Sequence, residues 1–441
     1  MNKVSKFAVN PGGCLQGSIS VPGDKSMSHR ALILASIAEG VSHIKGFLQG
    51  EDSLNTLQAF REMGISISDP KNSELIIEGK GLYGLRAANK PLYLGNSGTS
   101  MRLLSGLLAA QSFDSVLEGD ESLSKRPMKR VIQPLTLMGA DIRAGADDFP
   151  PLQIHRVEKL TGIHYVMPIA SAQVKSCLLL AGLYAHGKTS ITEPAPTRDH
   201  TERMLESFSC SVQRIANTVS VEGGARLRAT TLSIPGDISS AAFFIVGASL
   251  AKDSNILLLN IGINPTRTGI LDILSLMGAN ITLENQRFAG AEPVADIRVR
   301  SAKLNGIAIP KNLVPLAIDE FPVILIAAAC ASGKTVLTDA QELRVKETDR
   351  IRAMAEGLTL LGSQVVPTND GMIIEGNPAD RVFSSAQVDS YGDHRIAMAF
   401  AIAALRAKGR IMITNCENVA TSFPNFHGLA AAAGLSIEVI Q

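Results

Sequence analysis

The sequence predicts an α/β protein of two lobes, each built from three copies of one unit. A junction made of an apolar residue, a Gly or Ser and a short strand-like run recurs six times, with its second residue at positions 64, 139, 209, 278, 362 and 434. The near-even spacing indicates six copies of one unit. A chain of 441 residues is longer than one core usually serves, so we expect three units in each lobe.

Each of these junctions is typical of a helix that ends in a left-handed residue. The second residue is Gly in all but one copy, where it is Ser209, and a positive φ costs least in glycine because glycine has no Cβ. A second helix-to-strand junction recurs with Gly at positions 40, 187, 333 and 409. Each unit should therefore contain two helices and several strands.

Some of the helices are expected in the interior. The runs 174–185, 241–251, 323–331 and 396–405 are apolar on most sides, and a helix without a polar face is normally a buried one. We therefore expect mixed sheets on the outside of each lobe, around buried and largely apolar helices.

Two Pro-Gly steps mark where the chain is expected to pass between the lobes. Pro22-Gly23 and Pro235-Gly236 each follow a strand-like run and precede an Asp and a Ser-containing helix start. Residues 22–234 should form one lobe, and residues 1–21 with 235–441 the other. A double crossing places a hinge beside Lys25, so we expect closure to be coupled to ligand binding.

The composition argues against several classes of protein. Lys and Arg number 42 against 41 Asp and Glu, aromatic residues make up 4%, and Trp is absent, so nucleic-acid binding is not indicated. The five cysteines form no C-x-x-C pair and the eight histidines show no metal-type spacing, so we expect buried, reduced thiols and no metal. Without a signal peptide or an apolar run long enough to span a bilayer, we expect a cytoplasmic protein or one whose targeting segment has been removed.

Positive charge gathers at four predicted helix starts. The segments 22–30, 95–102, 344–350 and 391–395 each end in an arginine and lead into an apolar run. The first turn of a helix has free N–H groups and the positive end of the dipole, which favour anions. Four such starts in a nearly neutral chain predict a pocket for a small ligand with several negative groups.

Two of the four helix starts carry the clearest signal. Lys25, Ser26 and Arg30 fall within about one helical turn, with Ser26 placed to cap the helix, which favours an anion site over ordinary capping. The segment 96–102 is rich in small residues, which let a ligand approach the backbone amides.

Other polar residues at helix starts fit a structural role as well as a functional one. Ser171 fits a helix cap, and Arg126 before a proline fits a surface helix start. Asp319 precedes a strongly apolar helix, where it fits either a helix charge or a base for a substrate hydroxyl. Glu347 and Arg350 fit an i,i+3 ion pair. Spacing alone leaves both interpretations open.

The stretch 182–189 matches the P-loop pattern G-x-x-x-x-G-K-[ST]. A P-loop needs a strand before the match and a helix after it. Here an apolar helix precedes the match and a strand-like run follows, and segment 331–335 repeats the same turn. We therefore interpret the match as a junction of the repeat unit and reject a P-loop nucleotide hydrolase.

Together the motifs resemble the 5-enolpyruvylshikimate-3-phosphate (EPSP) synthase family, the 3-phosphoshikimate 1-carboxyvinyltransferases. In order they are Pro-Gly-x-Lys-Ser-x-Ser-x-Arg from 22, Gly-Asn-x-Gly-Thr-x-x-Arg from 95, Arg-Pro at 126, Ser-x-Gln at 171, Arg-x-Lys-Glu-x-Asp-Arg from 344 and Asp-His-Arg at 393. The resemblance implies the enolpyruvyl transferase fold, an inside-out α/β barrel. Each lobe then holds three βαβαββ-type units with buried parallel helices, and the active site lies in the cleft between the lobes.

The resemblance also implies an activity. The family transfers the enolpyruvyl group of phosphoenolpyruvate to the 5-hydroxyl of shikimate 3-phosphate and releases phosphate, by addition and elimination through a tetrahedral intermediate. It needs no metal or organic cofactor. The substrates carry two phosphates and two carboxylates, which suits the multiply anionic ligand expected above. The family further implies a monomer, a step in the shikimate pathway of aromatic amino-acid biosynthesis, and a target of glyphosate.

By the same resemblance each site residue receives a role. Lys25 is expected between the substrates, Asp319 accepts or orients the 5-hydroxyl proton, and Glu347 exchanges the proton at C3. The residues expected to hold shikimate 3-phosphate are Lys25, Ser26, Arg30, Ser171, Ala172, Gln173, Arg198, Asp319 and Lys346. Those expected to hold phosphoenolpyruvate are Lys25, Gly98, Arg126, Gln173, Arg350 and Arg395.

The chain departs from many family members at three positions. Thr421 stands where they have the Lys of a Lys-Thr-Phe-Pro run, Ala172 replaces a Ser, and Leu103 replaces a Pro after the loop arginine. These differences concern the subfamily and its sensitivity to inhibitors. Because Gly98 is retained, we predict that glyphosate competes with phosphoenolpyruvate.

Two further functions fit parts of the pattern. UDP-N-acetylglucosamine enolpyruvyl transferases resemble this fold but usually have Asn after the Lys and a loop Cys, whereas here Ser26 follows Lys25 and segment 118–130 has no Cys. A phosphoanion-binding protein without chemistry would not need Lys25, Asp319 and Glu347 together. Phosphate release with each acceptor separates the three.

Overall fold

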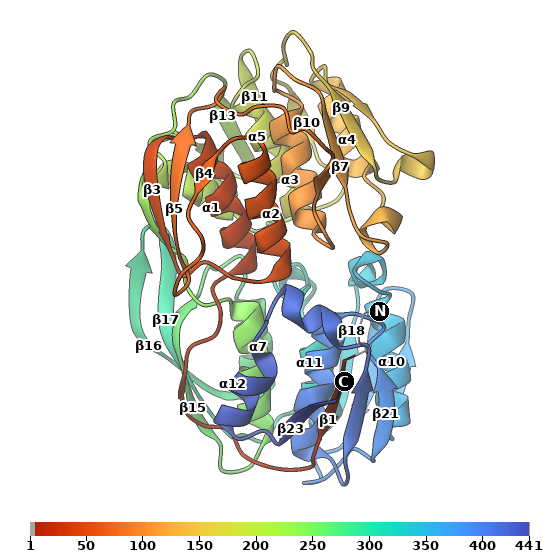
Figure 1. Cartoon of the computed structure of the whole chain (residues 1–441). Helices are drawn as coiled ribbons and strands as arrows, with labels where there is room; N and C mark the ends of the chain where they lie inside the picture. Colours follow the sequence, from red (N-terminus) through yellow and green to blue (C-terminus); the bar gives the residue numbers. More distant parts are fainter. Residues whose placement is uncertain (1–4, 441) are drawn as a thin grey trace. The chain divides into compact units, whose positions relative to one another are not determined.

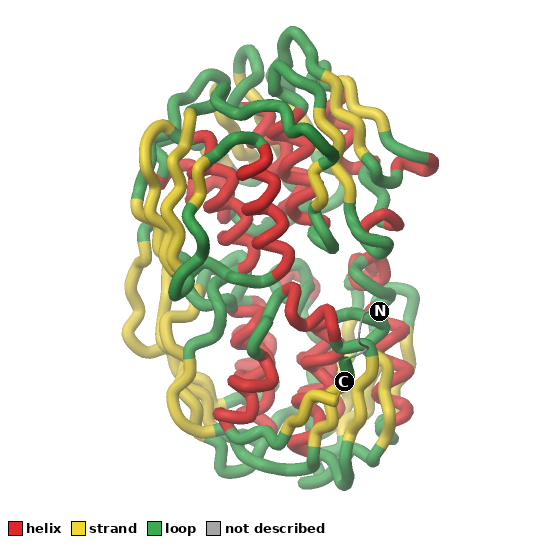
Figure 2. Tube along the Cα trace, viewed as in Figure 1, coloured by secondary structure: helices red, strands yellow, loops and turns green. Residues whose placement is uncertain are grey.

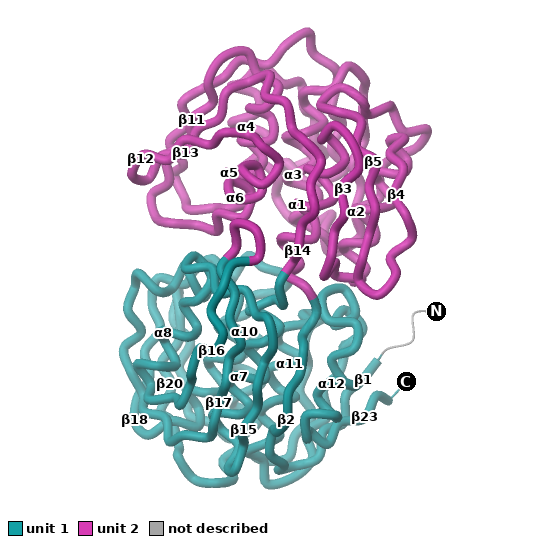
Figure 3. Tube along the Cα trace, turned by 90° about the vertical axis from the view of Figure 1, so that its left-hand side faces the viewer, with its two compact units in different colours: residues 1–22, 235–288, 293–441 teal, residues 23–234, 289–292 magenta. Residues whose placement is uncertain are grey.

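The computed structural model describes residues 5–440, which form two compact units (Figure 3). Unit 1 holds the chain up to Pro22, Pro235–Phe288 and the chain from Pro293 onward. Unit 2 holds Gly23–Ile234 and the short segment Ala289–Glu292. The chain therefore changes unit at both Pro-Gly steps, and the turn of one hairpin of unit 1 groups with unit 2.

Unit 2 contains three four-stranded sheets with the orders β14-β3-β5-β4, β6-β7-β9-β8 and β10-β11-β13-β12. In each order the first two strands are parallel and the remaining neighbours antiparallel. The strands are β3 (Glu39–Lys45), β4 (Ser66–Ile67), β5 (Glu74–Lys80), β6 (Leu92–Tyr93), β7 (Ser115–Glu118), β8 (Asp141–Arg143), β9 (Leu152–His155), β10 (His164–Val166), β11 (Lys188–Thr192), β12 (Gln213–Ile215), β13 (Thr218–Glu222) and β14 (Thr231–Ser233).

Unit 1 contains the other three sheets, ordered β16-β17-β15-β2, β18-β20-β19 and β21-β22-β1-β23. The strands are β1 (Lys6–Val9), β2 (Gln16–Ile19), β15 (Asn255–Gly262), β16 (Asn280–Ala289), β17 (Glu292–Arg300), β18 (Gly333–Leu337), β19 (Gln364–Pro367), β20 (Met372–Gly376), β21 (Ala386–Asp389), β22 (Ile411–Thr414) and β23 (Ile437–Ile440). Strand β1 lies antiparallel between β22 and β23, and Figure 1 labels β1 beside β23. The start of the chain thus completes the sheet formed by its end.

The helices alternate along the chain between buried and half-exposed. The buried helices are α1 (Lys25–Ile37), α3 (Gly98–Leu108), α5 (Ala172–Gly182), α7 (Ile238–Leu250), α9 (Phe321–Ala329) and α11 (His394–Ala403). The others are α2 (Glu51–Glu62), α4 (Lys129–Leu137), α6 (His200–Ser207), α8 (Gly269–Leu276), α10 (Arg350–Leu360) and α12 (Phe426–Ala433). Within each unit the strands lie outside and the buried helices inside (Figure 2), which confirms the expected layering.

Short 3₁₀ turns connect several elements. They are η1 (Leu123–Lys125), η2 (Ala146–Asp148), η3 (Lys311–Leu313), η4 (Gln341–Val345), η5 (Ala404–Arg406) and η6 (Glu417–Thr421). None of the helices among residues 5–440 combines the length and the apolar character needed to cross a bilayer.

The six junctions predicted from the repeat are confirmed in backbone conformation. All six residues have a positive φ, namely 86° at Gly64, 97° at Gly139, 65° at Ser209, 92° at Gly278, 87° at Gly362 and 116° at Gly434. Ser209 adopts the same conformation at a steric cost that the glycines avoid. The stretch 182–189 is likewise confirmed as a helix-to-strand junction, because α5 ends at Gly182 and β11 begins at Lys188.

Close packing of α3 against α5 depends on one glycine. A Cβ at Gly106 would lie 2.1 Å from the carbonyl oxygen of Cys177, which no real side chain tolerates. The Cys177 thiol is buried, and burial raises its pKa, so it behaves as a small apolar group. This contact sets the distance between two helices whose first turns carry Gly98 and Gln173.

Two expected helix starts are shifted in the structure. Helix α1 begins at Lys25 and is capped by Asp24, whose carboxylate accepts from the backbone N–H of Met27 at 2.8 Å. The expectation that Ser26 caps this helix is therefore wrong, because Asp is an equally good cap one step earlier. Helix α4 begins at Lys129 rather than beside Arg126.

Candidate functional site

Lys25 is held at the start of α1 by a buried carboxylate. It is the first residue of α1, and its ammonium forms an ion pair with Asp52 on α2. The Asp52 side chain is 4% exposed, whereas that of Lys25 is 23% exposed. A cation that remains partly accessible at a helix N-terminus is well placed to meet an anion.

Ser26, Arg30 and Arg198 lie together around the first turns of α1. Arg198 Nη1 lies 3.5 Å from Ser26 Oγ, and Arg30 Nη1 donates to the Ser26 carbonyl at 3.0 Å. The remaining Arg30 donors bond the hydroxyls of Thr201 and Ser176, each at 2.7 Å. Arg30 is therefore a buried support of this region as well as a predicted ligand.

Gly98 and Arg126 meet at the start of α3. Ser97 caps this helix by accepting from the N–H of Ser100 at 3.1 Å, and Gly98 is its first residue. A Cβ at Gly98 would lie 3.3 Å from Arg126 Nη1. Arg126 in turn donates to Asn96 Oδ1 at 2.5 Å. The Arg126 guanidinium thus lies beside the N-terminus of α3, where Gly98 has no side chain.

The start of α5 is joined to the start of α3. Ser171 caps α5, and its hydroxyl accepts from the N–H of Val174 at 3.4 Å; Ala172 and Gln173 form the first turn. Gln173 accepts from Arg102 Nη1 at 2.6 Å and donates to Thr99 at 2.9 Å. Within unit 2 the predicted residues of α1, α3 and α5 therefore all lie at helix N-termini, as the sequence indicated.

Unit 1 brings its five predicted site residues into one ionic cluster. Lys346 Nζ lies 3.3 Å from Asp319 Oδ1, and Arg350 Nη1 lies 3.4 Å from the same oxygen. Arg395 Nη1 donates to the Asp319 carbonyl at 3.0 Å. Arg350 Nη2 binds Glu347 at 2.6 Å. The two predicted proton-transfer residues, Asp319 and Glu347, therefore share one guanidinium.

Arg350 is the buried centre of that cluster. Its side chain is 1% exposed, and its Nε donates to Asp393 at 2.8 Å. Burial alone would lower the pKa of this guanidinium, but the carboxylates of Asp393, Glu347 and Asp319 outweigh it and raise the pKa. Arg350 is thus a permanent cation that holds three carboxylates together.

His29 on α1 connects this helix with α2 and α3 in unit 2. Its Nδ1 lies 2.9 Å from the Thr56 hydroxyl of α2 and 3.2 Å from the Ser100 hydroxyl of α3, and its Nε2 lies 3.5 Å from Ser97 Oγ. Complete burial, with Lys25 and Arg30 nearby, lowers the pKa of His29 to about 3. The imidazole is therefore neutral at physiological pH.

Several of these partners carried no usable signal in the sequence. Asp52 is an ordinary helix residue by pattern, and only the fold brings it to Lys25. Arg102 ends one of the four arginine-bearing segments, but its contact with Gln173 depends on the fold. Asp393 was the easiest to find, since it caps α11 by accepting from the N–H of Arg395 at 2.9 Å. Its second contact, with Arg350, depends on packing between α10 and α11.

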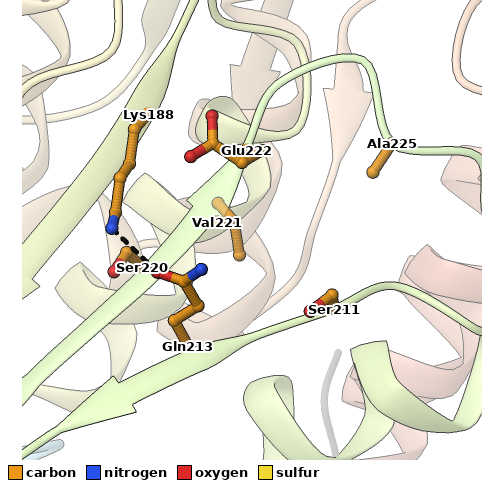
Figure 4. Close-up of a pocket in the computed structure, with 7 residues that line it drawn as sticks. All are labelled: Lys188, Ser211, Gln213, Ser220, Val221, Glu222 and Ala225. Carbon is orange, nitrogen blue, oxygen red and sulfur yellow. Dashed lines mark hydrogen bonds between the residues drawn. The ribbon is translucent and has the colours of Figure 1, made fainter.

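A small cavity lies apart from these residues, on the sheet that contains β11, β12 and β13 (Figure 4). It has a volume of about 90 Å³, and the lining residues are Lys188, Ser211, Gln213, Ser220, Val221, Glu222 and Ala225. Lys188 Nζ donates to Gln213 at 2.8 Å. None of the predicted site residues lines this cavity, so it is not the candidate site.

The fold and the site residues together define the enolpyruvyl transferase class. Each unit carries three sheets around buried helices, and the helix starts present cations. The family model described as EPSP synthase (3-phosphoshikimate 1-carboxyvinyltransferase) matches residues 9–429. The chain therefore belongs to the EPSP synthase family.

Known proteins agree with this assignment. A 3-phosphoshikimate 1-carboxyvinyltransferase of Nitrosococcus oceani is 60% identical over 432 residues, which are 98% of this chain and 96% of that protein. The enzyme of the same name from Methylococcus capsulatus is 59% identical over 433 residues, 98% of each chain. A solved structure of EPSP synthase from Acinetobacter baumannii has a TM-score of 0.90 at 55% identity and covers 99% of this chain and 100% of that one.

Proposed function

We infer that the chain transfers the enolpyruvyl group of phosphoenolpyruvate to the 5-hydroxyl of shikimate 3-phosphate and releases phosphate. The observation that carries this conclusion is the family match over residues 9–429 on a chain that retains Lys25, Asp319 and Glu347. The activity places the protein in the shikimate pathway of aromatic amino-acid biosynthesis. The rival acceptor, UDP-N-acetylglucosamine, is not favoured.

For unit 2 we propose that the helix starts bind the substrate anions. Ser26, Arg30, Arg198 and the first turn of α5 hold shikimate 3-phosphate. Gly98 and Arg126 hold phosphoenolpyruvate, because a bare helix start next to a guanidinium suits a phosphate or a carboxylate. Lys25 stabilises negative charge at the reacting carbon. The contact of Ser26 with Arg198 and the approach of Arg126 to Gly98 support this division.

For unit 1 we propose that the ionic cluster carries out the proton transfers. Glu347 gives a proton to C3 of phosphoenolpyruvate while the 5-hydroxyl oxygen bonds to C2 and Asp319 takes the hydroxyl proton. In the second step Glu347 removes a proton from C3, the C2–C3 double bond forms again, and the C2–O bond to phosphate breaks. The proton held by Asp319 leaves with the released phosphate, so both carboxyl groups return to their starting states. Arg350, Arg395 and Lys346 hold the substrates and keep both carboxylates in place.

The residues of the two units are proposed to act on the same pair of substrates. We also propose that the protein is a monomer in the cytoplasm and needs neither a metal nor an organic cofactor. Glyphosate is proposed to compete with phosphoenolpyruvate, because Gly98 is retained beside Arg126.

The test is phosphate release from phosphoenolpyruvate with each acceptor in turn. Release that depends on shikimate 3-phosphate, and not on UDP-N-acetylglucosamine, is the expected result. Release only with the nucleotide sugar would assign the sister reaction. Release with neither acceptor would indicate that the protein binds phosphoanions without catalysing the transfer.

A further inference from the structure

One buried lysine of unit 2 is not used by the proposed chemistry. Lys175 lies on α5, two residues after Gln173, and its side chain is 1% exposed. Lysine is almost never this deeply buried unless it is paired. A fully buried ammonium so close to a predicted substrate-binding turn calls for a physical reason.

The partners of Lys175 come from both ends of one loop. Its Nζ lies 2.7 Å from Glu193 Oε1, just after β11, and 2.7 Å from Glu202 Oε1 on α6. It also donates to the carbonyl of Thr197 at 3.4 Å. The loop between β11 and α6, residues 193–199, is thus tied to α5 at its start and near its end.

Glu193 connects Lys175 to the residue directly before Arg198. Its second oxygen accepts a short hydrogen bond from the hydroxyl of Thr197, the residue directly before Arg198. Arg198 Nη1 then lies 3.5 Å from Ser26 Oγ. The contacts that begin at Lys175 therefore reach the residue next to Arg198.

Glu202 differs from Glu193 in one useful respect. Its Oε2 is buried and has no hydrogen-bond partner among residues 5–440, whereas both oxygens of Glu193 are bonded. Glu202 Oε1 therefore balances the charge of Lys175, while its Oε2 makes no hydrogen bond to the loop. Burial raises the pKa of Glu193, while the contacts with Lys175 and Thr197 oppose that shift.

We propose that Lys175 and Glu193 are positioning residues that hold Arg198 for the phosphate of shikimate 3-phosphate. This inference rests on the proposed function and adds to it the support that orders one substrate-binding loop. It assigns no proton transfer to either residue.

The test compares Glu193→Gln with Glu202→Gln, two changes that keep volume and remove one carboxylate charge next to the same lysine. Glu193→Gln is expected to raise the KM for shikimate 3-phosphate roughly tenfold, on the order of one lost charge-assisted contact. Its kcat and its KM for phosphoenolpyruvate should stay within about twofold. Glu202→Gln, the matched control, should leave all three constants within about twofold. Equal effects of the two changes would overturn the proposal.

A double variant tests whether Glu193 acts through Arg198. If it does, Glu193→Gln combined with Arg198→Lys raises this KM no further than Arg198→Lys alone. If the double variant raises the KM for shikimate 3-phosphate by the product of the two single-variant factors, the proposal is contradicted. Should Glu193→Gln fold poorly, Thr197→Val removes the same loop bond while keeping the Lys175 pair, and the same selective rise is expected; no rise would again overturn it. A parent protein without acceptor-dependent phosphate release would instead disprove the proposed function.

Discussion

At the scale of single residues, the site consists of groups whose neighbours leave them little freedom. Arg350 is surrounded by three carboxylates, and Lys25 is paired with Asp52. Such arrangements fix charge in advance, so little reorganisation is needed when substrate charge develops. Changes of one atom or one charge should therefore have specific kinetic effects.

Gly98→Ala should weaken glyphosate more than phosphoenolpyruvate. The added Cβ would lie 2.9 Å from Arg102 Nη1 and 3.3 Å from Arg126 Nη1, so both guanidiniums must shift. We expect the inhibition constant for glyphosate to rise by a larger factor than the KM for phosphoenolpyruvate, with the KM for shikimate 3-phosphate unchanged. Inhibition curves at several phosphoenolpyruvate concentrations measure both quantities. Equal losses, or inhibition that is not competitive, would refute the crowding argument.

Glu347→Gln should slow turnover rather than weaken binding. The amide cannot exchange a proton at C3, while Arg350 keeps Asp393 and Asp319 as partners and the fold survives. We expect kcat to fall by roughly 10²- to 10⁴-fold, the range for a lost proton-transfer group, with both KM values changed only a few-fold. Glu356→Gln on α10, which removes a surface partner of Tyr391, is the control. Normal turnover of Glu347→Gln would remove Glu347 from the chemistry.

At the scale of elements, the helix starts are aligned by contacts between helices. His29 joins α1 to α2 and α3, and Gly106 allows α3 and α5 to approach. The close approach of α3 to α5 is accompanied by the contact of Gln173 with Thr99. The geometry of the site is therefore a property of the packed helices.

The neutral state of His29 predicts a loss of stability in acid. Its pKa falls from 6.5 to about 3 on folding, so the folded state binds this proton more weakly than the unfolded state. The contribution of neutral His29 to the free energy of unfolding is fully present above about pH 6.5. It is lost as the pH falls toward 3, by several kcal/mol at most. His29→Asn should flatten this part of the stability profile in urea unfolding between pH 7.5 and 4. His427→Asn, at an exposed position, should leave the slope unchanged; an unchanged slope in His29→Asn would show that His29 is not the titrating group.

Much of the element plan could be predicted from the sequence because its signals are local. The left-handed residue at each junction and the apolar character of the buried helices are visible within a few positions. The contacts that complete the site are not local. Lys175 with Glu193, Arg350 with Asp393 and Arg30 with Thr201 join residues from different elements, and no spacing rule predicts such pairs.

The cap of α1 shows a further limit of local prediction. Asp24 and Ser26 are both good capping residues, so the pattern indicates a helix start without choosing between them. The structure selects Asp24, because its carboxylate reaches the N–H of Met27. This leaves the Ser26 hydroxyl near Arg198.

At the scale of the whole molecule, the chain forms six similar repeats, three in each compact unit. The first described strand, β1, belongs to the sheet of the last repeat. Strand β1 takes the place between β22 and β23 that β5 takes between β3 and β4. Pairing across almost the entire sequence is invisible to any local pattern. It ties the first described residues into the core of unit 1, where Phe7 is 3% exposed.

Phe7→Ala should therefore destabilise unit 1 strongly. The Phe7 ring lies 6.2 Å from that of Phe426, between centroids, and truncation of a buried Phe typically costs 3–5 kcal/mol, so we expect a loss of about 3 kcal/mol. Lys6→Ala, next to it on β1 but partly exposed, should cost much less. Denaturant midpoints measure both variants. Equal small losses would mean that β1 is dispensable for the core.

Enolpyruvyl transfer differs from phosphoryl transfer in which bond of phosphoenolpyruvate breaks. The most direct measurement uses phosphoenolpyruvate with ¹⁸O in the bridging position between C2 and phosphorus, together with shikimate 3-phosphate. Addition and elimination break the C2–O bond, so mass spectrometry should find the label in the released phosphate and an enolpyruvyl group added to the acceptor. Label retained on the three-carbon product, with unlabelled phosphate, would mean cleavage of the P–O bond and would contradict enolpyruvyl transfer.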